Sequence, residues 1–353
     1  MKKKSRMTYM VLLLSLVLCL TGCKGKTITS EPQSSGAVTP QVVAVTEKPA
    51  IQTVKRTDTR TRVYLVTEYD KNGKVLSERE FNRNGGHLEA TTYTYDTNGN
   101  LLTKVFEKSG KTVSYVKKNY DNDGNLIEEY KGDSKDTLLL QQEYKYESGL
   151  LKKEIWYEDD GSVWEYYNYE YNDDGLLQLK TKNGDDDYEY RRWIYEYDEN
   201  GILSSVTDEM YNHKQISFYD EQGNVVRSDY YTADDKLSAI YINVFGPFGL
   251  VEDYRYDSDG KEEYHGKIYY DANGNRMKTV EVDKKGNETV EGIYEYDDDG
   301  NLIHSENKNG YYVYDAEYNE FGDPIMTHNV CKDPTRSAGT YDDLFEYEYT
   351  YYQ

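Results

Sequence analysis

Apolar and polar residues alternate over short stretches of this chain, and glycine-centred turns interrupt the alternation at regular intervals. Residues 93–102 (YTYDTNGNLL) show the unit: rings at alternate positions, a polar turn, and an apolar pair. Because side chains two positions apart share one face of a strand, this pattern predicts a strand, a tight turn and a returning strand.

The unit recurs through most of the chain. An aromatic residue opens the turn eleven times, at gaps of 22 to 26 residues: Tyr69, Tyr95, Tyr120, Tyr146, Tyr171, Tyr197, Tyr219, Phe245, Tyr270, Tyr296 and Tyr318. A nearly constant period of this size is typical of a repeat architecture. A second turn signal, such as residues 107–110 (EKSG) or 283–286 (DKKG), divides each period near its middle. At roughly 12 residues per strand and turn, the spacing predicts an antiparallel all-β chain.

The residue types in the turn explain how it forms. An aspartate such as Asp96 accepts hydrogen bonds from backbone amides just ahead of it and closes an Asx-turn. A glycine three residues later, such as Gly99, suits the left-handed position that ends a type I turn with a bulge.

Alternation also assigns the two faces of the predicted sheet. One face gathers rings at positions two apart, such as Tyr167, Tyr169 and Tyr171. The other face is polar in most repeats and apolar in the middle of the chain, with Ile194, Ile216, Phe218, Ile240, Ile242 and Val244. A flat sheet of about twenty strands is unusual. We therefore predict an all-β antiparallel meander of repeated β-hairpins, curled or spiralling, with residues 345–352 as a strand that caps the array.

The units with the pattern Tyr-Asp-x-x-Gly-Asn-Leu resemble the YD repeats of the RHS family and of related large toxin and cell-surface proteins. The resemblance covers most of residues 60–325. It implies a β-sheet that winds into a hollow shell, in that family sometimes around a toxic C-terminal domain. This chain is short, and we expect it to end in a strand without a toxin-sized domain.

The first residues read as an export signal. Lys2, Lys3, Lys4 and Arg6 precede a short apolar run from Met10 to Leu20, too short to span a bilayer comfortably as a helix. Residues 20–23 (LTGC) resemble the lipobox of bacterial lipoproteins, which implies lipidation of Cys23; an ordinary secretory signal is the alternative. We therefore predict a lipoprotein signal peptide over residues 1–22, a flexible tether over 23–58, and a repeat domain over 59–353.

Charge limits the partners. The formal net charge of −23 becomes −27 when the four cations of the signal (Lys2, Lys3, Lys4 and Arg6) are removed. Such a surface repels nucleic acid and anionic polymers, so we expect no nucleic-acid partner. The 40 tyrosines argue against disorder, because disordered chains are poor in aromatic residues.

Candidate chemistry is sparse. Cys331 near His328 suggests a nucleophile and a base, with no third residue to complete a triad. Around Gly300, Glu295, Asp297, Asp299 and Glu306 fall at offsets like those of an EF-hand calcium loop, although the Asp-rich turn explains the same residues. The five histidines lack metal-ligand spacing, and no catalytic fingerprint is found. We expect no metal, no cofactor and no enzymatic activity.

Tyrosine rows have two interpretations. Rings with hydroxyls can stack on sugars or peptides, and cross-strand aromatic pairs also stabilise a sheet. The candidate ligand-binding residues are Tyr93, Tyr95, Tyr167, Tyr169, Tyr171, Trp193, Tyr195, Tyr197, Tyr294 and Tyr296.

We predict a cell-surface protein outside the cytoplasm, anchored to the membrane through Cys23, that binds or scaffolds a glycan or a protein. The alternatives are a shell-type relative of the RHS and YD toxin-delivery proteins and a hydrolase with a hidden site.

Overall fold

The computed structural model describes residues 48–333, 335 and 339–352. The predicted signal peptide, the tether up to residue 47 and Cys23 lie outside the described residues. No helix of the described part is long and apolar enough to cross a membrane. Its one short helix is the 3-10 turn η1 (Lys135–Thr137).

Within the described residues, twenty-four strands form one sheet. They are β1 (Ile51–Asp58), β2 (Tyr64–Tyr69), β3 (Val75–Phe81), β4 (His87–Tyr95), β5 (Leu101–Lys108), β6 (Lys111–Tyr120), β7 (Leu126–Gly132), β8 (Leu139–Glu147), β9 (Leu150–Tyr157), β10 (Val163–Tyr171), β11 (Leu177–Gly184), β12 (Glu189–Tyr197), β13 (Leu203–Met210), β14 (His213–Tyr219), β15 (Val225–Thr232), β16 (Leu237–Gly246), β17 (Gly249–Asp257), β18 (Glu262–Tyr270), β19 (Arg276–Val282), β20 (Glu288–Tyr296), β21 (Leu302–Asn307), β22 (Tyr312–Tyr318), β23 (Pro324–Cys331) and β24 (Tyr341–Tyr351).

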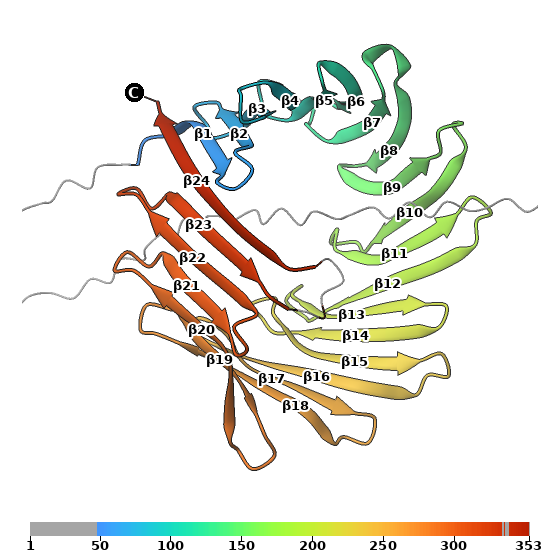
Figure 1. The fold of residues 1–353 in the computed structure, drawn as a ribbon. Coiled ribbons are helices and arrows are strands. Elements are labelled where there is room, and N and C mark those ends of the chain that lie inside the picture. The colour runs from blue at the N-terminus through green and yellow to red at the C-terminus, as the bar shows by residue number, and fades with distance from the viewer. Residues whose placement is uncertain (1–47, 334, 336–338, 353) are drawn as a thin grey trace, which may run out of the picture. The chain divides into compact units, whose positions relative to one another are not determined.

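The predicted antiparallel meander is confirmed, but its ends differ from the prediction. Each strand pairs with the next along the chain, and β24 also pairs antiparallel with β1, for example Tyr349 with Val54 (Figure 1). The sheet therefore closes on itself instead of curling or spiralling with free ends. The final strand joins the two ends and is not a cap. Closure pairs the backbone groups that an edge strand would leave open.

One predicted boundary is also wrong. The tether was extended to residue 58, but residues 51–58 form β1 and pair with both β2 and β24. The sheet thus begins before the first recognisable repeat. β1 lacks the Tyr-Asp signature, so the periodicity gave no sign of it.

The predicted turn chemistry is confirmed. Asp96 Oδ1 accepts hydrogen bonds from the backbone N–H of Asn98 at 2.9 Å and of Asn100 at 2.7 Å. Gly99 has φ of +89° and donates its N–H to the Asp96 carbonyl at 3.0 Å. The glycine of every one of the eleven repeat turns, from Gly73 to Gly322, has a positive φ. Beside each opening aromatic the register shifts: Thr94 pairs with Thr103 and Tyr95 with Leu101, which leaves Leu102 as the extra residue of a β-bulge.

The turns form two rims. We call the end of the sheet that carries the eleven repeat turns the repeat rim, and the end that carries the intervening turns the variable rim. Connections on the variable rim range from the two residues 211–212 to the nine residues 332–340. The described chain enters β1 and leaves β24 on the repeat rim, because β2 ends there at Tyr69.

Register also defines two faces. The tyrosine face is the side that carries Tyr93, Tyr167 and Trp193, and the other side is the opposite face. The predicted apolar group is confirmed on the opposite face, where Ile194 lies in register with Ile216 through Thr207. Few side chains form a buried apolar core: Ala90, Ile155, Val280, Val282, Ala316, Val330 and Cys331. Pairing across strands, and not a packed second layer, thus holds most of the described sheet together.

Candidate functional site

Strands that carry the predicted rings alternate with strands that carry charged side chains. Tyr167 on β10 lies opposite Glu154 on β9 and Lys182 on β11, and Trp193 on β12 lies opposite Lys180. The expectation of direct aromatic pairs is therefore wrong for these strands. Rings on one strand meet charged side chains on the next, and ring contacts span two strands, as between Tyr167 and Trp193 at 6.4 Å.

Cations cover most of the candidate rings. Lys180 Nζ lies 4.6 Å from the centre of the Tyr167 ring, 5.2 Å from Tyr169 and 5.2 Å from Trp193. The other covered candidates are Tyr93 by Lys104, Tyr95 by Lys74, Tyr171 by Lys152 and Tyr294 by Arg276. Cation–π contacts of this kind stabilise the sheet and occupy the ring faces that a sugar would stack on.

The hydroxyls of several candidate tyrosines also donate hydrogen bonds. Tyr95 donates to the Val75 carbonyl at 2.8 Å, and Tyr171 and Tyr197 make the equivalent bond to Leu151 and Leu177. Each bond joins the ring that opens one repeat turn to the strand that leaves the preceding one. Further along the strands, tyrosines donate to carboxylates instead, such as Tyr93 to Glu78 at 2.7 Å. Burial, followed by this hydrogen bond, raises the pKa of Tyr93.

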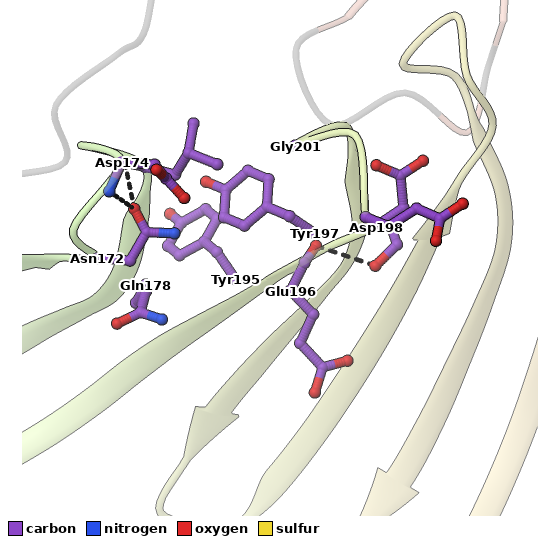
Figure 2. Close-up of a pocket in the computed structure, with 11 residues that line it drawn as sticks. Asn172, Asp174, Gln178, Tyr195, Glu196, Tyr197, Asp198 and Gly201 are labelled. Atoms are coloured by element: carbon purple, nitrogen blue, oxygen red, sulfur yellow. Dashed lines mark hydrogen bonds between the residues drawn. The ribbon is translucent and has the colours of Figure 1, made fainter.

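Tyr195 differs from most of the other candidates. Among the described residues, its hydroxyl makes no hydrogen bond and no cation lies over its ring. It lines a groove of about 530 Å³ between the turn that follows β10 and the turn that follows β12. In Figure 2, Tyr195 and Tyr197 point toward the turn that holds Asn172 and Asp174, while the Glu196 side chain points away. Tyr294 and Tyr296 do not line this groove.

The groove is acidic and its walls are fixed by turn hydrogen bonds. Asn172 Oδ1 accepts from the N–H of Asp174 at 3.1 Å and of Leu176 at 2.8 Å. Asp198 accepts the equivalent pair from its own turn, and these backbone bonds lower the pKa of its carboxyl. Asp174 and Glu199 add two more carboxylates, and the Gln178 amide adds a donor. The groove thus offers rings and acceptors, an arrangement suited to a neutral or cationic group.

The candidate nucleophile and base, Cys331 and His328, lie apart in the folded chain. Cys331 lies in register with Tyr312 and Tyr341 on the tyrosine face, whereas His328 pairs with Asp315 on the opposite face. The two side chains leave opposite sides of one strand, so the nucleophile and base are not brought together.

The calcium-like set near Gly300 also has a structural use. Asp297 Oδ1 accepts from the N–H of Asp299 and of Asn301, and its Oδ2 accepts from the Asn301 amide at 2.9 Å. Within the described part of the chain, no three His, Cys, Asp or Glu residues are grouped so that they could hold a metal ion.

Sequence reasoning missed one site on the variable rim. Trp164, Tyr190 and Met210 are exposed and line a second pocket with Glu165, Lys182 and Arg191. Simple alternation puts Trp164 and Tyr190 on the face away from Tyr167. Bulges in their strands bring them to the pocket, and no residue type in the sequence marks those bulges.

No protein-family model and no curated protein matches the chain. Among solved structures, the crystal structure of TcdB2-TccC3-Cdc42 aligns with 80% of this chain and 17% of that chain, at 14% identity and a TM-score of 0.48. The Tc holotoxin pore of Photorhabdus luminescens aligns with 76% of this chain and 17% of that chain, at 13% identity and a TM-score of 0.40. A porin-like protein from Bacteroides uniformis aligns with 85% of this chain and 98% of that chain, at 10% identity and a TM-score of 0.23.

The chain thus spans 17% of the length of the Tc toxin chains that it resembles. At these TM-scores the all-β class stands on the strand pairing of the chain itself.

Proposed function

We propose that this chain is a lipid-anchored, non-catalytic binding module that stands outside the cytoplasm and holds a cell-surface glycan or protein. The sequence of residues 1–23 supports export and lipidation at Cys23. The described chain starts on the repeat rim, so the predicted tether joins the sheet at that rim.

The observation that carries the binding role is Tyr195. Its ring and hydroxyl are unused within the described sheet, although most of the neighbouring candidates are covered by cations or bonded to carbonyls. It faces an open groove whose volume of about 530 Å³ lies within the roughly 300–1,000 Å³ usual for small-ligand sites. Preformed rings beside polar acceptors bind at low cost in conformational entropy.

The carboxylates of the groove narrow the partner. Asp174, Asp198 and Glu199 repel anionic polymers, so the bound group is neutral or cationic. An amino sugar or a lysine-bearing peptide meets this condition. Either group can lie against the ring face while the carboxylates accept its hydrogen bonds.

Binding measurements test the proposed role of the groove directly. A glycan array and a panel of cationic peptides are probed with the purified protein and with Tyr195→Ala. We expect Tyr195→Ala to lose at least tenfold in affinity, and Tyr294→Ala, a ring outside the groove and covered by Arg276, to bind like the parent protein. Equal binding by the parent and Tyr195→Ala would remove the groove from the proposal.

Anchoring is tested separately. The full chain and Cys23→Ser are expressed in a bacterium, and the mass of the N-terminal peptide is measured. We expect an acylated peptide beginning at Cys23 from the parent chain and no acylation in the variant. An unmodified cysteine at that position would contradict the membrane anchor.

A shell-type role is the second candidate, favoured by the closure of the sheet through β1 and β24. Such a protein accompanies an effector, so an adjacent effector gene with its immunity gene would support it. Turnover of generic ester, peptide or glycoside substrates would instead overturn the non-catalytic proposal.

A further inference from the structure

The variable rim carries a pocket between β10, β11, β12 and β13. Its volume is about 440 Å³, and its lining is Trp164, Glu165, Lys182, Gly184, Asp185, Tyr190, Arg191 and Met210. The Trp164 side chain is 52% exposed, Tyr190 48% and Met210 39%. Three large apolar side chains left open around one hollow mark a binding surface more often than a structural one.

Two bulges create the apolar wall. Val163 pairs with Tyr157 and Glu165 with Trp156, so Trp164 is the extra residue of its strand. Tyr190 is likewise skipped on β12, between Glu189 and Arg191. The Trp164 ring meets the Trp156 ring edge-on at 6.2 Å, which places it on the tyrosine face. A bulge of this kind re-aims a side chain at the end of a sheet.

Gly184 shows that the Tyr190 ring is seated closely. A Cβ at Gly184 would lie 2.6 Å from Tyr190 Cε2, so a larger residue there would push the ring from the pocket. The absence of a side chain at this position leaves the ring against the backbone and keeps the hollow open.

The floor of the pocket is charged and already ordered. Glu165 is only 8% exposed, accepts a hydrogen bond from Lys182 Nζ at 2.6 Å, and accepts another from the Tyr167 hydroxyl at 3.1 Å. Arg191 donates from Nε to Asp208 at 2.7 Å, and its Cζ lies 4.6 Å from the centre of the Trp193 ring. A paired, hydrogen-bonded floor is held in one geometry before any ligand arrives.

The balance of charge identifies the ligand class. Two cations, Lys182 and Arg191, face two carboxylates, Glu165 and Asp185, in a chain whose net charge is −23. An acidic ligand would need a surplus of cations, and a purely apolar ligand would remove water from these charged groups without returning hydrogen bonds. A neutral sugar has hydroxyls that both donate and accept, and an apolar ring face that stacks on tryptophan or tyrosine.

We propose that the pocket beside Trp164 binds a neutral saccharide unit, as a site separate from the Tyr195 groove on the repeat rim. Trp164 and Tyr190 supply the stacking wall. Lys182 and Arg191 donate to the sugar oxygens, and the carboxylates of Glu165 and Asp185 accept from its hydroxyls.

The test is a calorimetric titration of the purified protein with five neutral pentasaccharides, namely maltopentaose, cellopentaose, laminaripentaose, chitopentaose and mannopentaose, and with polygalacturonate. We expect at least one neutral member to bind and polygalacturonate not to bind. Binding should also shield the exposed Trp164 ring from a neutral fluorescence quencher.

Variants make the result specific. Trp164→Ala and Tyr190→Ala should each weaken binding at least tenfold, with unchanged circular dichroism and thermal midpoint as the check on folding. Tyr211→Ala is the matched control, because this ring is 88% exposed on the same rim and does not line the pocket. Tyr294→Ala, a ring that lines neither this pocket nor the groove, should also bind the saccharides like the parent protein.

Three results would overturn the proposal. They are the failure of all five neutral saccharides to bind, equal affinity in Trp164→Ala and the parent, and binding confined to polygalacturonate.

Discussion

The turns of both rims join adjacent antiparallel strands, but the two rims differ in the charge of their turns and in how much the turns vary. The connections on the repeat rim contain sixteen acidic and two basic residues, whereas those on the variable rim contain thirteen acidic and eleven basic residues. Turns on the repeat rim follow one chemistry almost throughout. Turns on the variable rim differ in length, and one of them contains η1. The pocket beside Trp164 also lies at this rim.

Some neighbouring turns on the repeat rim contact one another. On the repeat rim, Lys74 Nζ donates to the Gly99 carbonyl at 2.7 Å, one turn further along. A Cβ on Gly274 would lie 2.8 Å from the ring of Phe248 in the preceding turn. Tyrosine hydroxyl bonds add a link between several neighbouring hairpins. Where two repeat turns touch, a change in one disturbs its neighbour. A Cβ would meet open space at Gly110, Gly161, Gly260 and Gly286 on the variable rim, and also at Gly73, Gly149, Gly175 and Gly223 on the repeat rim.

The largest effect is expected from glycine substitutions. Gly274 on the repeat rim and Gly286 on the variable rim both have positive φ, of +90° and +83°. Alanine at either costs about 1–2 kcal/mol for the left-handed backbone. Gly274→Ala adds crowding against Phe248, for a total of about 2–4 kcal/mol. Urea unfolding measures both, and equal losses would show that contact between turns is unimportant.

A smaller effect is expected from the hydroxyl bonds. Tyr95→Phe and Tyr171→Phe each remove a bond from a ring to the neighbouring strand on the repeat rim, at a cost of about 1 kcal/mol. Tyr195→Phe is the matched control and should change the free energy of unfolding by less than about 0.5 kcal/mol. A loss in Tyr195→Phe as large as in Tyr95→Phe would mean that these bonds do not join the repeats.

An alkaline titration tests the raised pKa of a tyrosine near the variable rim. A hydrogen bond to Asp187, followed by burial, raises the pKa of Tyr166 to about 12, above its ordinary 10.0. Asp187→Asn removes the negative charge and tolerates the positive φ of this position, so the pKa of Tyr166 should fall toward 10.

The sign of the pH effect follows from the raised pKa. The folded chain holds the proton more tightly than the unfolded chain, so the contribution of Tyr166 to stability is present below pH 10 and lost as pH rises toward about 12. Ultraviolet titration of tyrosinate measures the shift. Tyr157, whose pKa burial and Glu143 raise to about 12, should titrate unchanged in Asp187→Asn.

The smallest effect at neutral pH is expected from aspartate-to-asparagine changes in the turns. Asn172 and Asn319 already take the place of aspartate in their repeat turns and accept the same two backbone bonds, so Asp96→Asn should fold normally. Backbone hydrogen bonds lower the pKa of Asp96, so its carboxylate contributes stability above its ordinary pKa and loses it as pH falls through the lower folded value.

Asp96→Asn should therefore flatten the acid limb of the thermal midpoint against pH. Asp283→Asn on the variable rim should give the same result, because that turn has the same bonds. A difference between the two would show that the rims differ in turn chemistry as well as in contacts between turns.

Local chemistry made much of the fold predictable. The eleven repeat turns, their left-handed glycines and the two-residue alternation of faces all depend on neighbours within a few positions, and all were confirmed. β1 was missed because it has no turn signature, and direct pairing of rings was wrong for β9 to β12 because register sets charged side chains opposite the rings there.

The candidate site was predictable only in part. The sequence pointed to Tyr195 and Tyr197 as rings on one face, but not to which rings remain free, since that depends on where Lys104, Lys152 and Lys180 reach across strands. Trp164 and Tyr190 could not be assigned, because bulges reverse the face that alternation gives them.

By itself, the sequence determined that the chain is a series of antiparallel hairpins, because turn type is set by the residues within each turn. Only the tertiary structure decided that the sheet closes and which rings face open space. Closure pairs β1 with β24, strands about 300 residues apart whose partner choice no local pattern encodes. The free rings are likewise those that long side chains on neighbouring strands leave uncovered.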